Sequence, residues 1–424
     1  MDLNRQTAFE VLVDVEKNLS YSNLALNNFI KKNKPDDMPF VRELVYGVLR
    51  NKYFLDYSIR PFVPKGFNSL KPREISLLRL GAYQLLLMNS VPEYAAVSET
   101  VELAKRFLKG RERFVNGVLR SLIRDRERIK YPDAEKDIVK HFSIMYSCEE
   151  WIAELWIKAY GIKKTREILE ACAIRPELSV RVNITKTTRD ELLERLKKNG
   201  FEAEKSDNSE RAIIVKGTGL IDNKSYREGL FSVQDEASIM SSDILGAEPG
   251  DFVIDCCAAP GGKTFAACEK MNNTGRIVSM DIYDKKIEAM AKEAHRLGLS
   301  IVETVVHDAT KVKNEFIGKV DKVICDVPCS GLGVLRKKPE IRYKSNEDME
   351  ELIRRQRKIL SSASQYIKKG GILLYSTCTV NPDENEKQIR QFLDSNPEFE
   401  ILDEKQFLPT MGIDGFYVAK LLKK

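Results

Sequence analysis

The chain has 424 residues, a formal net charge of +6 and 43% hydrophobic residues. Such a length suggests two or three domains, and the composition is globular, with no low-complexity tract. No apolar run is long enough to span a bilayer, and the N-terminus is a helix pattern with acidic residues, unlike a signal peptide. We therefore expect a cytoplasmic protein with no membrane contact.

The positive charge is concentrated in the first third of the chain. Residues 1–140 hold 25 Lys and Arg against 18 Asp and Glu, a net charge of +7, whereas the remainder holds 44 against 45. This imbalance fits an N-terminal domain that binds a polyanion, and it fits an ordinary solvated surface equally well.

The cysteines argue against a disulfide framework. There are eight, without C-x-x-C pairs or regular spacing, and only three histidines accompany them. Neither disulfides nor a zinc or other metal site is therefore expected. Most free cysteines are buried and inert.

Residues 1–140 are predicted to form an all-helical domain. Apolar residues recur at three- and four-residue spacing in 5–15, 40–59, 72–88 and 95–108. The domain should end with the helix RERFVNGVLRSLIRDRERIK, residues 111–130.

This last predicted helix has two faces. Its apolar face consists of Phe114, Val118, Leu119 and Leu122, and six arginines spread over the rest. The arginine face is compatible with an RNA-binding helix and with a merely exposed one.

Residues 141–235 are expected to hold linker helices and a small α/β module. The polar segment YPDAEKD (131–137), at the end of the preceding helical domain, is a plausible linker to this region. CEEWIAELWIKAYG (148–161) should be a helix that ends at Gly161. From residue 178, a strand (LSVRVNI), a capped helix (TRDELLERLKKNG) and a second strand (AIIVKG) follow.

Residues 236–424 are predicted to form an α/β domain. Continuous apolar strands between helices indicate a parallel sheet with helices on both faces. The predicted strands are 251–256, 275–282, 301–308, 320–328, 372–378 and 415–423, and the predicted helices are 263–271, 284–298 and 348–371.

A glycine-rich loop follows the first of these strands. AAPGGKT (258–264) allows main chain to approach a ligand closely, and the next helix offers free N–H groups to an anion or carboxylate. The upstream glycine of a P-loop is missing, which disfavours a phosphate-binding ATPase.

Acidic residues end the strands around this loop. Asp255, Asp281, Asp308 and Asp326 stand at or near the carboxyl ends of four strands, where ligands bind in such sheets. An acid after the second strand typically accepts both hydroxyls of a ribose. The pocket is suited to an adenosine-bearing cofactor, and both NAD and S-adenosylmethionine satisfy that description.

Two cysteines are predicted to open onto the same crevice. Cys329 follows Pro328 after the fourth strand, and Cys378 follows Thr377 after the fifth. Only a thiolate attacks, so we expect a positive or hydrogen-bonding neighbour, for which Lys263 is a candidate. Arg336, Lys337 and Lys338, just beyond the first cysteine, could contact a phosphate backbone.

The motifs DCCAAPGGKT, DVPCSGLGVLRKKPEIRY and YSTCTVNPDENE closely resemble those of RNA cytosine-5 methyltransferases that use S-adenosylmethionine. The basic helical front resembles the RNA-binding domain of the NusB antitermination factor. The whole chain thus looks like the bacterial Sun/Fmu (RsmB-type) enzymes, which methylate a cytosine of 16S ribosomal RNA.

The resemblance implies a fold for each part of the chain. It implies an all-α NusB-like domain over 1–140, the linker helices and small α/β module over 141–235, and a Rossmann-like class I methyltransferase domain over 236–424. The implied partner is 16S rRNA, and nothing in the sequence demands a dimer, so a monomer is expected.

The resemblance also implies roles for individual residues. Cys378 would attack C6 of the cytosine, Cys329 would assist release, and Asp326 would hydrogen-bond the ring and lie near the cofactor's methyl end. The residues that match cofactor contacts are Cys257, Ala258, Ala259, Pro260, Gly261, Gly262, Lys263, Asp281, Asp308 and Asp326.

Several readings compete with this one. DNA cytosine-5 methyltransferases use the proline-cysteine thiol as nucleophile, which would exchange Cys329 and Cys378. The methyltransferase core alone would also fit a transfer-RNA enzyme, and a catalytically silent RNA-binding assembly factor is a third alternative. The remaining cysteines match no catalytic role, and we expect them to be structural: Cys148, Cys172, Cys256, Cys268 and Cys325.

Overall fold

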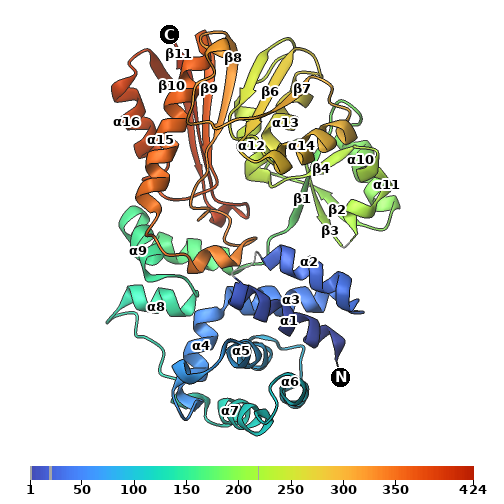
Figure 1. Cartoon of the computed structure of the whole chain (residues 1–424), viewed down its shortest axis with the longest axis vertical. Coiled ribbons are helices and arrows are strands. Elements are labelled where there is room, and N and C mark those ends of the chain that lie inside the picture. The colour runs from blue at the N-terminus through green and yellow to red at the C-terminus, as the bar shows by residue number, and fades with distance from the viewer. Residues whose placement is uncertain (1, 19–21, 218) are drawn as a thin grey trace. The chain divides into compact units, whose positions relative to one another are not determined.

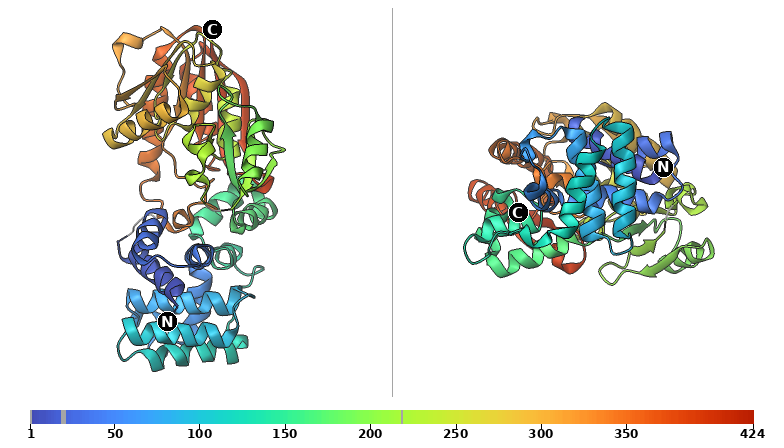
Figure 2. Two further views of the ribbon diagram at one scale, coloured as in Figure 1. Left: turned by 90° about the vertical axis from the view of Figure 1, so that its right-hand side faces the viewer. Right: turned by 90° about the horizontal axis from the view of Figure 1, so that it is seen from below.

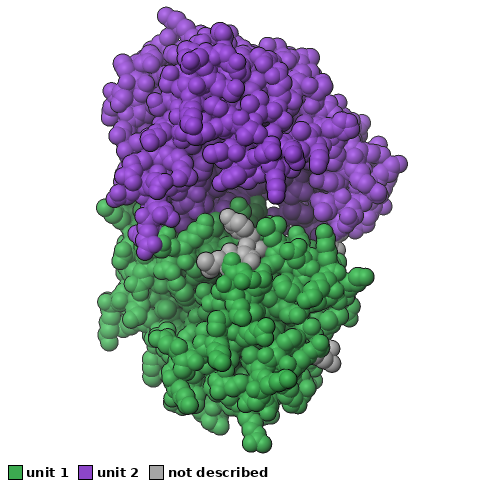
Figure 3. All heavy atoms as spheres, in the orientation of Figure 1, with its two compact units in different colours: residues 1–173, 337–345 green, residues 174–336, 346–424 purple. Residues whose placement is uncertain are grey.

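The computed structural model describes residues 2–18, 22–217 and 219–424, and its contacts divide the chain into two compact units (Figures 1 and 3). Unit 1 consists of the chain up to Ala173 together with Lys337–Ser345. Unit 2 consists of Ile174–Arg336 and Asn346–Lys424. Met1, the first residue of the predicted N-terminal domain, lies outside the described residues.

Unit 1 is helical, as predicted. Apolar side chains from its helices form one buried core, and α5, α6 and α7 lie side by side (Figure 2). Its α-helices are α1 (Leu3–Asn18), α2 (Ser22–Asn33), α3 (Met38–Arg50), α4 (Lys52–Ile59), α5 (Pro72–Leu87), α6 (Glu93–Phe107), α7 (Glu112–Arg124), α8 (Ile138–Met145) and α9 (Glu150–Ala173).

The helices differ from the prediction in three details. Helix α2 was missed, and the predicted helix 40–59 is broken at Asn51, which separates α3 from α4. On α7 Val115 is buried in addition to the predicted Val118, Leu119 and Leu122, whereas Phe114 is partly buried against the same core, with the Arg111 guanidinium 4.3 Å from its ring centroid.

A segment from the second half of the chain belongs to unit 1. Residues 337–345 include a short 3-10 helix, η6 (Pro339–Tyr343), and the side chain of Arg342 is buried. Arg342 donates hydrogen bonds to the carbonyls of Tyr146 (2.9 Å) and Cys172 (2.6 Å). The hydroxyl of Tyr343 donates to the carbonyl of Leu49 at 2.6 Å.

Helix α9 is interrupted where the sequence predicted a helix end. Gly161 has φ of +76°, which suits glycine and breaks the helix into two parts. The second part, up to Ala173, was not predicted.

Unit 2 begins with a small antiparallel sheet. Its strand order is β2-β3-β1-β4, and helix α10 covers the apolar side chains of β1 and β3. The elements are β1 (Leu178–Val182), α10 (Arg189–Lys198), β2 (Glu202–Lys205), β3 (Ala212–Lys216), α11 (Lys224–Arg227) and β4 (Phe231–Val233).

The rest of unit 2 is a seven-stranded sheet with helices against it, in strand order β10-β11-β9-β8-β5-β6-β7 (Figure 1). The strands are β5 (Phe252–Asp255), β6 (Arg276–Asp281), β7 (Val302–Val306), β8 (Val320–Asp326), β9 (Ile367–Thr377), β10 (Phe399–Phe407) and β11 (Phe416–Lys423). The helices are α12 (Glu236–Ile244), α13 (Gly262–Lys270), α14 (Asp284–Leu297), α15 (Met349–Tyr366) and α16 (Glu386–Ser395).

The sheet is mixed: five neighbouring strands are parallel, as predicted, and the antiparallel pairing of the two strands at one edge was not predicted. Strands β5 to β9 are parallel, whereas β11 runs antiparallel to β9 and to β10. The predicted helix 348–371 ends at Tyr366 because Ile367 already pairs with Val320 in the sheet. Pairing then resumes at Ile372, and the loop at Gly370 (φ +78°) absorbs the intervening residues.

Two absences hold for the described residues alone. No helix among them is long and apolar enough to cross a membrane. Over the same ranges, no group of three His, Cys, Asp or Glu side chains is placed to hold a metal ion.

Candidate active site

The crevice of the large sheet lies where its strand order reverses. Strand β5 neighbours β6 on one side and β8 on the other, so the connections on the two sides diverge. The loops that follow β5 to β9 all leave the parallel part of the sheet at its carboxyl edge. The sequence-predicted site residues lie in these loops or at these strand ends.

The loop between β5 and α13 is shaped by its glycines. Gly261 has φ of +105°, and a Cβ there would lie 2.4 Å from the Phe265 ring. A Cβ at Gly262 would lie 3.2 Å from the amide of Gln234. The loop therefore presents main chain where α13 begins, and a helix start of this kind favours an anion or carboxylate.

Two of the predicted acids lie at or just beyond the ends of β6 and β7, the strands on one side of β5 in the sheet. Asp281 ends β6, is 9% exposed, and accepts a hydrogen bond from the Tyr283 amide on one oxygen (3.0 Å). Asp308 lies two residues beyond β7, and hydrogen bonds from Thr310 hold its pKa below the usual value. Both carboxylates retain lone pairs for further donors such as ribose hydroxyls.

An apolar pair beside Asp281 was missed from the sequence. Ile282 and Tyr283 are 57% and 59% exposed, which is unusual for large apolar side chains. They are exposed apolar side chains next to an acid, a combination that fits an adenine ring and its ribose. The signal was present in the sequence as two apolar residues directly after a strand-end acid. Together with the glycine turn, these residues fit an adenosine-bearing cofactor.

Asp255 is placed under the loop and away from solvent. Its side chain is buried, the hydroxyl of Thr264 donates to its Oδ2 at 2.7 Å, and its Oδ1 has no hydrogen-bond partner among the described residues. Burial raises its pKa to about 7. Asp255 therefore holds the first turn of α13 through its hydrogen bond with Thr264.

The two predicted cysteines lie together. Their sulfur atoms are 3.2 Å apart, although the residues are 49 positions apart in the chain. The contact with Cys378, burial and the charge of Glu384 raise the pKa of the Cys329 thiol well above its usual value. Cys329 therefore keeps its proton near neutral pH.

Asp326 connects the loops of Cys329 and Cys378 to the glycine-rich loop between β5 and α13. Its Oδ2 lies 2.7 Å from the ammonium of Lys263, and its Oδ1 accepts a 2.7 Å hydrogen bond from the Ser376 hydroxyl. Lys263 is 6% exposed and also lies over the Phe416 ring, 4.6 Å from its centroid. The sequence suggested Lys263 as a thiol neighbour, and the structure instead gives it an ion pair with Asp326.

A buried carboxylate behind the cysteines was also missed. Glu384 is fully buried and accepts hydrogen bonds from Ser330, Gln356 and Asn381. In the sequence it stands in the polar run NPDENE, where a turn on the surface is the ordinary expectation.

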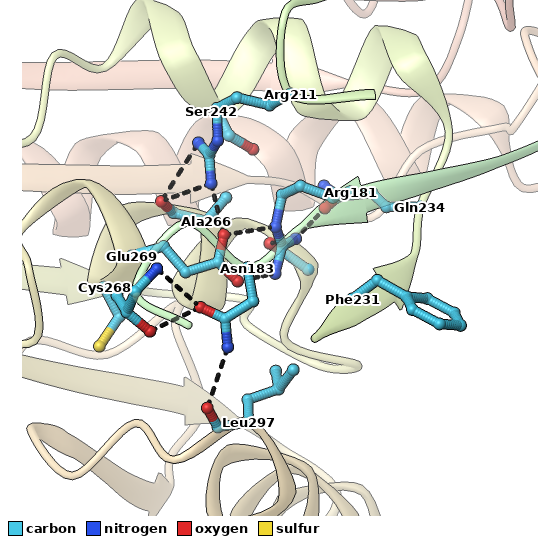
Figure 4. A network of polar contacts seen from close by, with 12 residues as sticks. Arg181, Asn183, Arg211, Phe231, Gln234, Ser242, Ala266, Cys268, Glu269 and Leu297 are labelled. Carbon is cyan, nitrogen blue, oxygen red and sulfur yellow. Dashed lines mark hydrogen bonds and ion pairs between the residues drawn. The ribbon is translucent and has the colours of Figure 1, made fainter. Parts of the chain in front are cut away.

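A second buried network joins the small sheet to α13 (Figure 4). Arg181 of β1 makes two parallel hydrogen bonds to Glu269 of α13, at 2.8 and 2.9 Å, and neither side chain has any exposed area. Arg211 contacts the same carboxylate. Arg181 also donates to the carbonyl of Gly262 at 2.8 Å, so this network fixes the glycine-rich loop from behind.

The remaining predicted residues have structural surroundings. Cys148, Cys172, Cys256, Cys268 and Cys325 are all buried, as expected. Burial also raises the pKa of the Cys257 thiol, which is only partly exposed. Arg336 is 6% exposed and donates to the carbonyl of Gly412 at 2.8 Å, so the suggested phosphate contact is wrong for this residue. Lys338 is exposed, and Lys337 is half-buried.

Three family models match the chain. Residues 242–422 match the 16S rRNA methyltransferase RsmB/F family, and residues 2–124 match the NusB family. Residues 149–222 match the ferredoxin-like domain of RsmF/B-like methyltransferases.

Curated relatives and a solved structure match over the whole length. The probable ribosomal RNA small subunit methyltransferase B of Bacillus subtilis is 38% identical, over 99% of this chain and 98% of the relative. The one of Synechocystis is 34% identical, over 99% of both chains. The crystal structure of PH0851 is 26% identical, with a TM-score of 0.83 over 100% of this chain and 99% of that one.

Proposed function

The chain belongs to the 16S rRNA methyltransferase RsmB/F family, and we propose that it methylates C5 of a specific cytosine in 16S ribosomal RNA. The family resemblance of the three motifs is thereby confirmed, as are the S-adenosylmethionine-dependent activity and the NusB-like front. The observation that carries the cytosine-5 proposal is the pair of thiols 3.2 Å apart, Cys329 and Cys378. They follow the strands that carry Asp326 and Ser376. Asp326 accepts from the Ser376 hydroxyl and pairs with Lys263 of the loop between β5 and α13.

In the proposed reaction, the Cys378 thiolate adds to C6 of the cytosine, which makes C5 nucleophilic. S-adenosylmethionine, when bound, supplies the methyl group that C5 takes up, and its sulfur leaves as a thioether. The C5 proton then passes to a base, the Cys378–C6 bond breaks, and the thiolate is restored. Covalent addition divides one difficult step into two easier ones. The target base must leave its stack to reach the thiols.

The motif position of Cys378 in YSTCTVNPDENE supports it as the nucleophile, because the family resemblance assigns the attack to that cysteine. The contact with Cys378, burial and the charge of Glu384 raise the pKa of Cys329, which suits a proton donor. We assign Cys329 the assisting role in product release. The reverse assignment, as in DNA cytosine-5 methyltransferases, would need Cys329 to be the thiolate.

Asp326 is proposed to hold the cytosine ring. Its Oδ2 accepts from Lys263 and its Oδ1 from Ser376, and each oxygen retains a lone pair that can accept from the exocyclic amine of cytosine. The ion pair with Lys263 ties this carboxylate to the cofactor loop, so base and cofactor would be oriented by one connected set of residues.

The proposed cofactor contacts come from three strand ends. The loop Cys257–Lys263 would receive the amino acid part, Asp281 the ribose hydroxyls, and Ile282 with Tyr283 the adenine face. Asp308 would complete this edge of the crevice.

The helical front is proposed to bind the RNA backbone. A hollow of about 660 Å³ in unit 1 is lined by six cations, and its single acid, Glu74, is buried and paired with Arg111. No large apolar side chain is exposed there among the described residues, which disfavours a protein partner. The cations are Lys17, Lys65, Lys71, Arg73, Lys109 and Arg111.

Three further expectations stay proposals. We propose the division into 1–140, 141–235 and 236–424, a monomeric protein, and a cytoplasmic location with the RNA substrate.

The test uses methyl-labelled S-adenosylmethionine, 16S rRNA and denaturing gels. Wild type should label the RNA, Cys378→Ala should neither label nor form an adduct, and Cys329→Ala should leave a slow band of protein joined to RNA. If Cys378→Ala accumulates the adduct instead, the two roles are reversed. If transfer RNA is labelled and 16S rRNA is not, the proposed substrate is wrong. If the protein binds S-adenosylmethionine but methylates no RNA, the alternative of a catalytically silent assembly factor is favoured.

A further inference from the structure

We propose that Glu384 is a positioning residue that holds the loops of Cys329 and Cys378 in register, so that the two thiols meet. This inference rests on the proposed function for its catalytic meaning, although the geometry it describes does not depend on the substrate. Glu384 lies in the turn between β9 and α16, and none of its surface is exposed.

The carboxylate of Glu384 accepts four hydrogen bonds from three segments. Its Oε2 accepts from the Ser330 amide (2.8 Å) and the Gln356 side chain (2.9 Å). Its Oε1 accepts from the Ser330 hydroxyl (2.5 Å) and the Asn381 side chain (3.0 Å). The first cysteine loop, helix α15 and the second cysteine loop therefore converge on one side chain.

These bonds fix the first cysteine from both sides. Ser330 follows Cys329 and is held through its amide and its hydroxyl. Pro328 precedes Cys329, and its carbonyl accepts from Gln356 at 2.9 Å, the same amide group that binds Glu384. The main chain on either side of Cys329 is thus tied to Glu384 directly or through one residue.

The second cysteine is tied to the same network. The Ser330 hydroxyl lies 2.8 Å from the Thr379 hydroxyl, and the amide of Gly333 donates to the Cys378 carbonyl at 3.0 Å. Asn385, next to Glu384, accepts from Thr377 and donates to the Thr379 carbonyl. Both neighbours of Cys378 are therefore held by this turn.

The choice of an acid at this position needs a reason other than stability. The donors to Glu384 among the described residues are all uncharged, and burying a carboxylate without a counter-charge is costly. Four donors point at the two oxygens of this side chain, which requires a carboxylate. A Gln side chain would replace one oxygen by an NH₂ group, whose hydrogens would face two of these donors. The charge also helps Cys329 to keep its proton; the titratable groups that face this thiol are Cys378, Glu384 and Tyr375.

The test replaces Glu384 by Gln and uses Glu386→Gln as its matched control. Glu386 is the same residue type two positions later, at the start of α16, and is half-buried outside the cysteine network. Ser330→Ala is a milder second variant, which removes one donor and keeps the amide. Thermal unfolding and S-adenosylhomocysteine affinity establish that each variant is folded.

The first readout is the rate at which diamide joins Cys329 and Cys378. Diamide takes up the two thiol hydrogens while the S–S bond forms, and the thiols need to be in contact for this reaction. Loss of the Glu384 charge also lowers the pKa of Cys329, so the rates are measured across pH and compared for equal thiolate fractions. On that basis we expect Glu384→Gln to slow this reaction at least about tenfold, Ser330→Ala to slow it less, and Glu386→Gln to leave it unchanged. A merely structural role would change the folded fraction without changing the rate per folded molecule.

The second readout is methyl transfer to 16S rRNA. Displacing reacting groups by about 1 Å costs up to about 100-fold in rate, so kcat should fall while KM for RNA stays within about twofold. A folded Glu384→Gln with wild-type diamide and methylation rates would overturn the inference. If wild type methylates no 16S rRNA, the proposed function fails, and the diamide rates still decide the role of Glu384.

Discussion

Replacing Glu269 by Gln should destabilise unit 2 far more than a surface substitution. Glu269 is fully buried between Arg181 and Arg211, and it accepts three hydrogen bonds from their guanidinium groups. Gln keeps the shape but leaves two buried cations with only Asp243, which is 29% exposed, as a negative partner. Breaking a buried ion pair in this way costs about 3–5 kcal/mol.

Hydrogen exchange is the suitable assay for this change. The chain has two tryptophans, Trp151 and Trp156, and both lie in α9, so tryptophan fluorescence follows unit 1. The amides of β1 and α13 report on unit 2, and a loss of about 3–5 kcal/mol should accelerate their exchange by about two to four powers of ten.

A surface ion pair provides the control for this experiment. Glu303 pairs with Arg276 and both are about half exposed, so Glu303→Gln should cost less than about 1 kcal/mol. Fluorescence-detected unfolding of unit 1 should be the same in both variants. If Glu269→Gln exchanges within threefold of the control, the buried network does not stabilise the unit as argued.

Three further predictions concern cofactor, RNA and pH. Asp281→Asn should weaken S-adenosylhomocysteine binding about 10- to 100-fold in calorimetry, since hydrogen bonds to a charged group contribute about 1.5–3 kcal/mol. Changing Lys71, Arg73 and Lys109 together to Gln should weaken 16S rRNA binding and reduce the salt slope of log K by about two to three. Because burial raises the pKa of Asp255 to about 7, the native protein binds a proton that the unfolded chain releases near its ordinary pKa of 3.8. Stability should therefore fall as pH rises from about 4 to about 7, and Asp255→Asn should flatten the melting temperature across that range.

Each of these predictions has an outcome that would contradict it. Unchanged cofactor affinity in Asp281→Asn would remove the ribose contact. Lys31, Lys32 and Lys34 lie outside the hollow. If changing these three to Gln weakens RNA binding as much as changing Lys71, Arg73 and Lys109, the hollow is not a specific RNA-binding site. If the melting temperature of Asp255→Asn depends on pH as that of the wild type does, a group other than Asp255 is responsible for the titration.

The site was predictable where its signals are local in sequence. A glycine pair after an apolar strand, acids at strand ends and cysteines after strands each need only a few neighbouring residues. Their common place at one sheet edge follows from the parallel topology. For this reason Gly261, Asp281 and the two cysteines could be named before the fold was known.

The residues that support the site were not predictable in this way. Arg181 and Glu269 are 88 positions apart, and a charged residue in a sequence is usually exposed. Glu384 stands among polar residues typical of a surface turn. Strand β10, FEILDEKQF, is an edge strand whose charges hide the pattern, and only its pairing with β11 defines it.

The assignment of residues 337–345 to unit 1 has a consequence for protein synthesis. During synthesis, residues up to Ala173 emerge from the ribosome long before Arg342 and Tyr343 do. Until then the carbonyls of Tyr146, Cys172 and Leu49 lack the donors that they have in the finished protein. The helical unit is therefore the first to be synthesised but is completed late, after the strand that carries Asp326. Unit 1 can form its last hydrogen bonds only after the segment that follows Cys329 has been synthesised. The order of residues in the chain therefore couples the completion of unit 1 to the synthesis of unit 2.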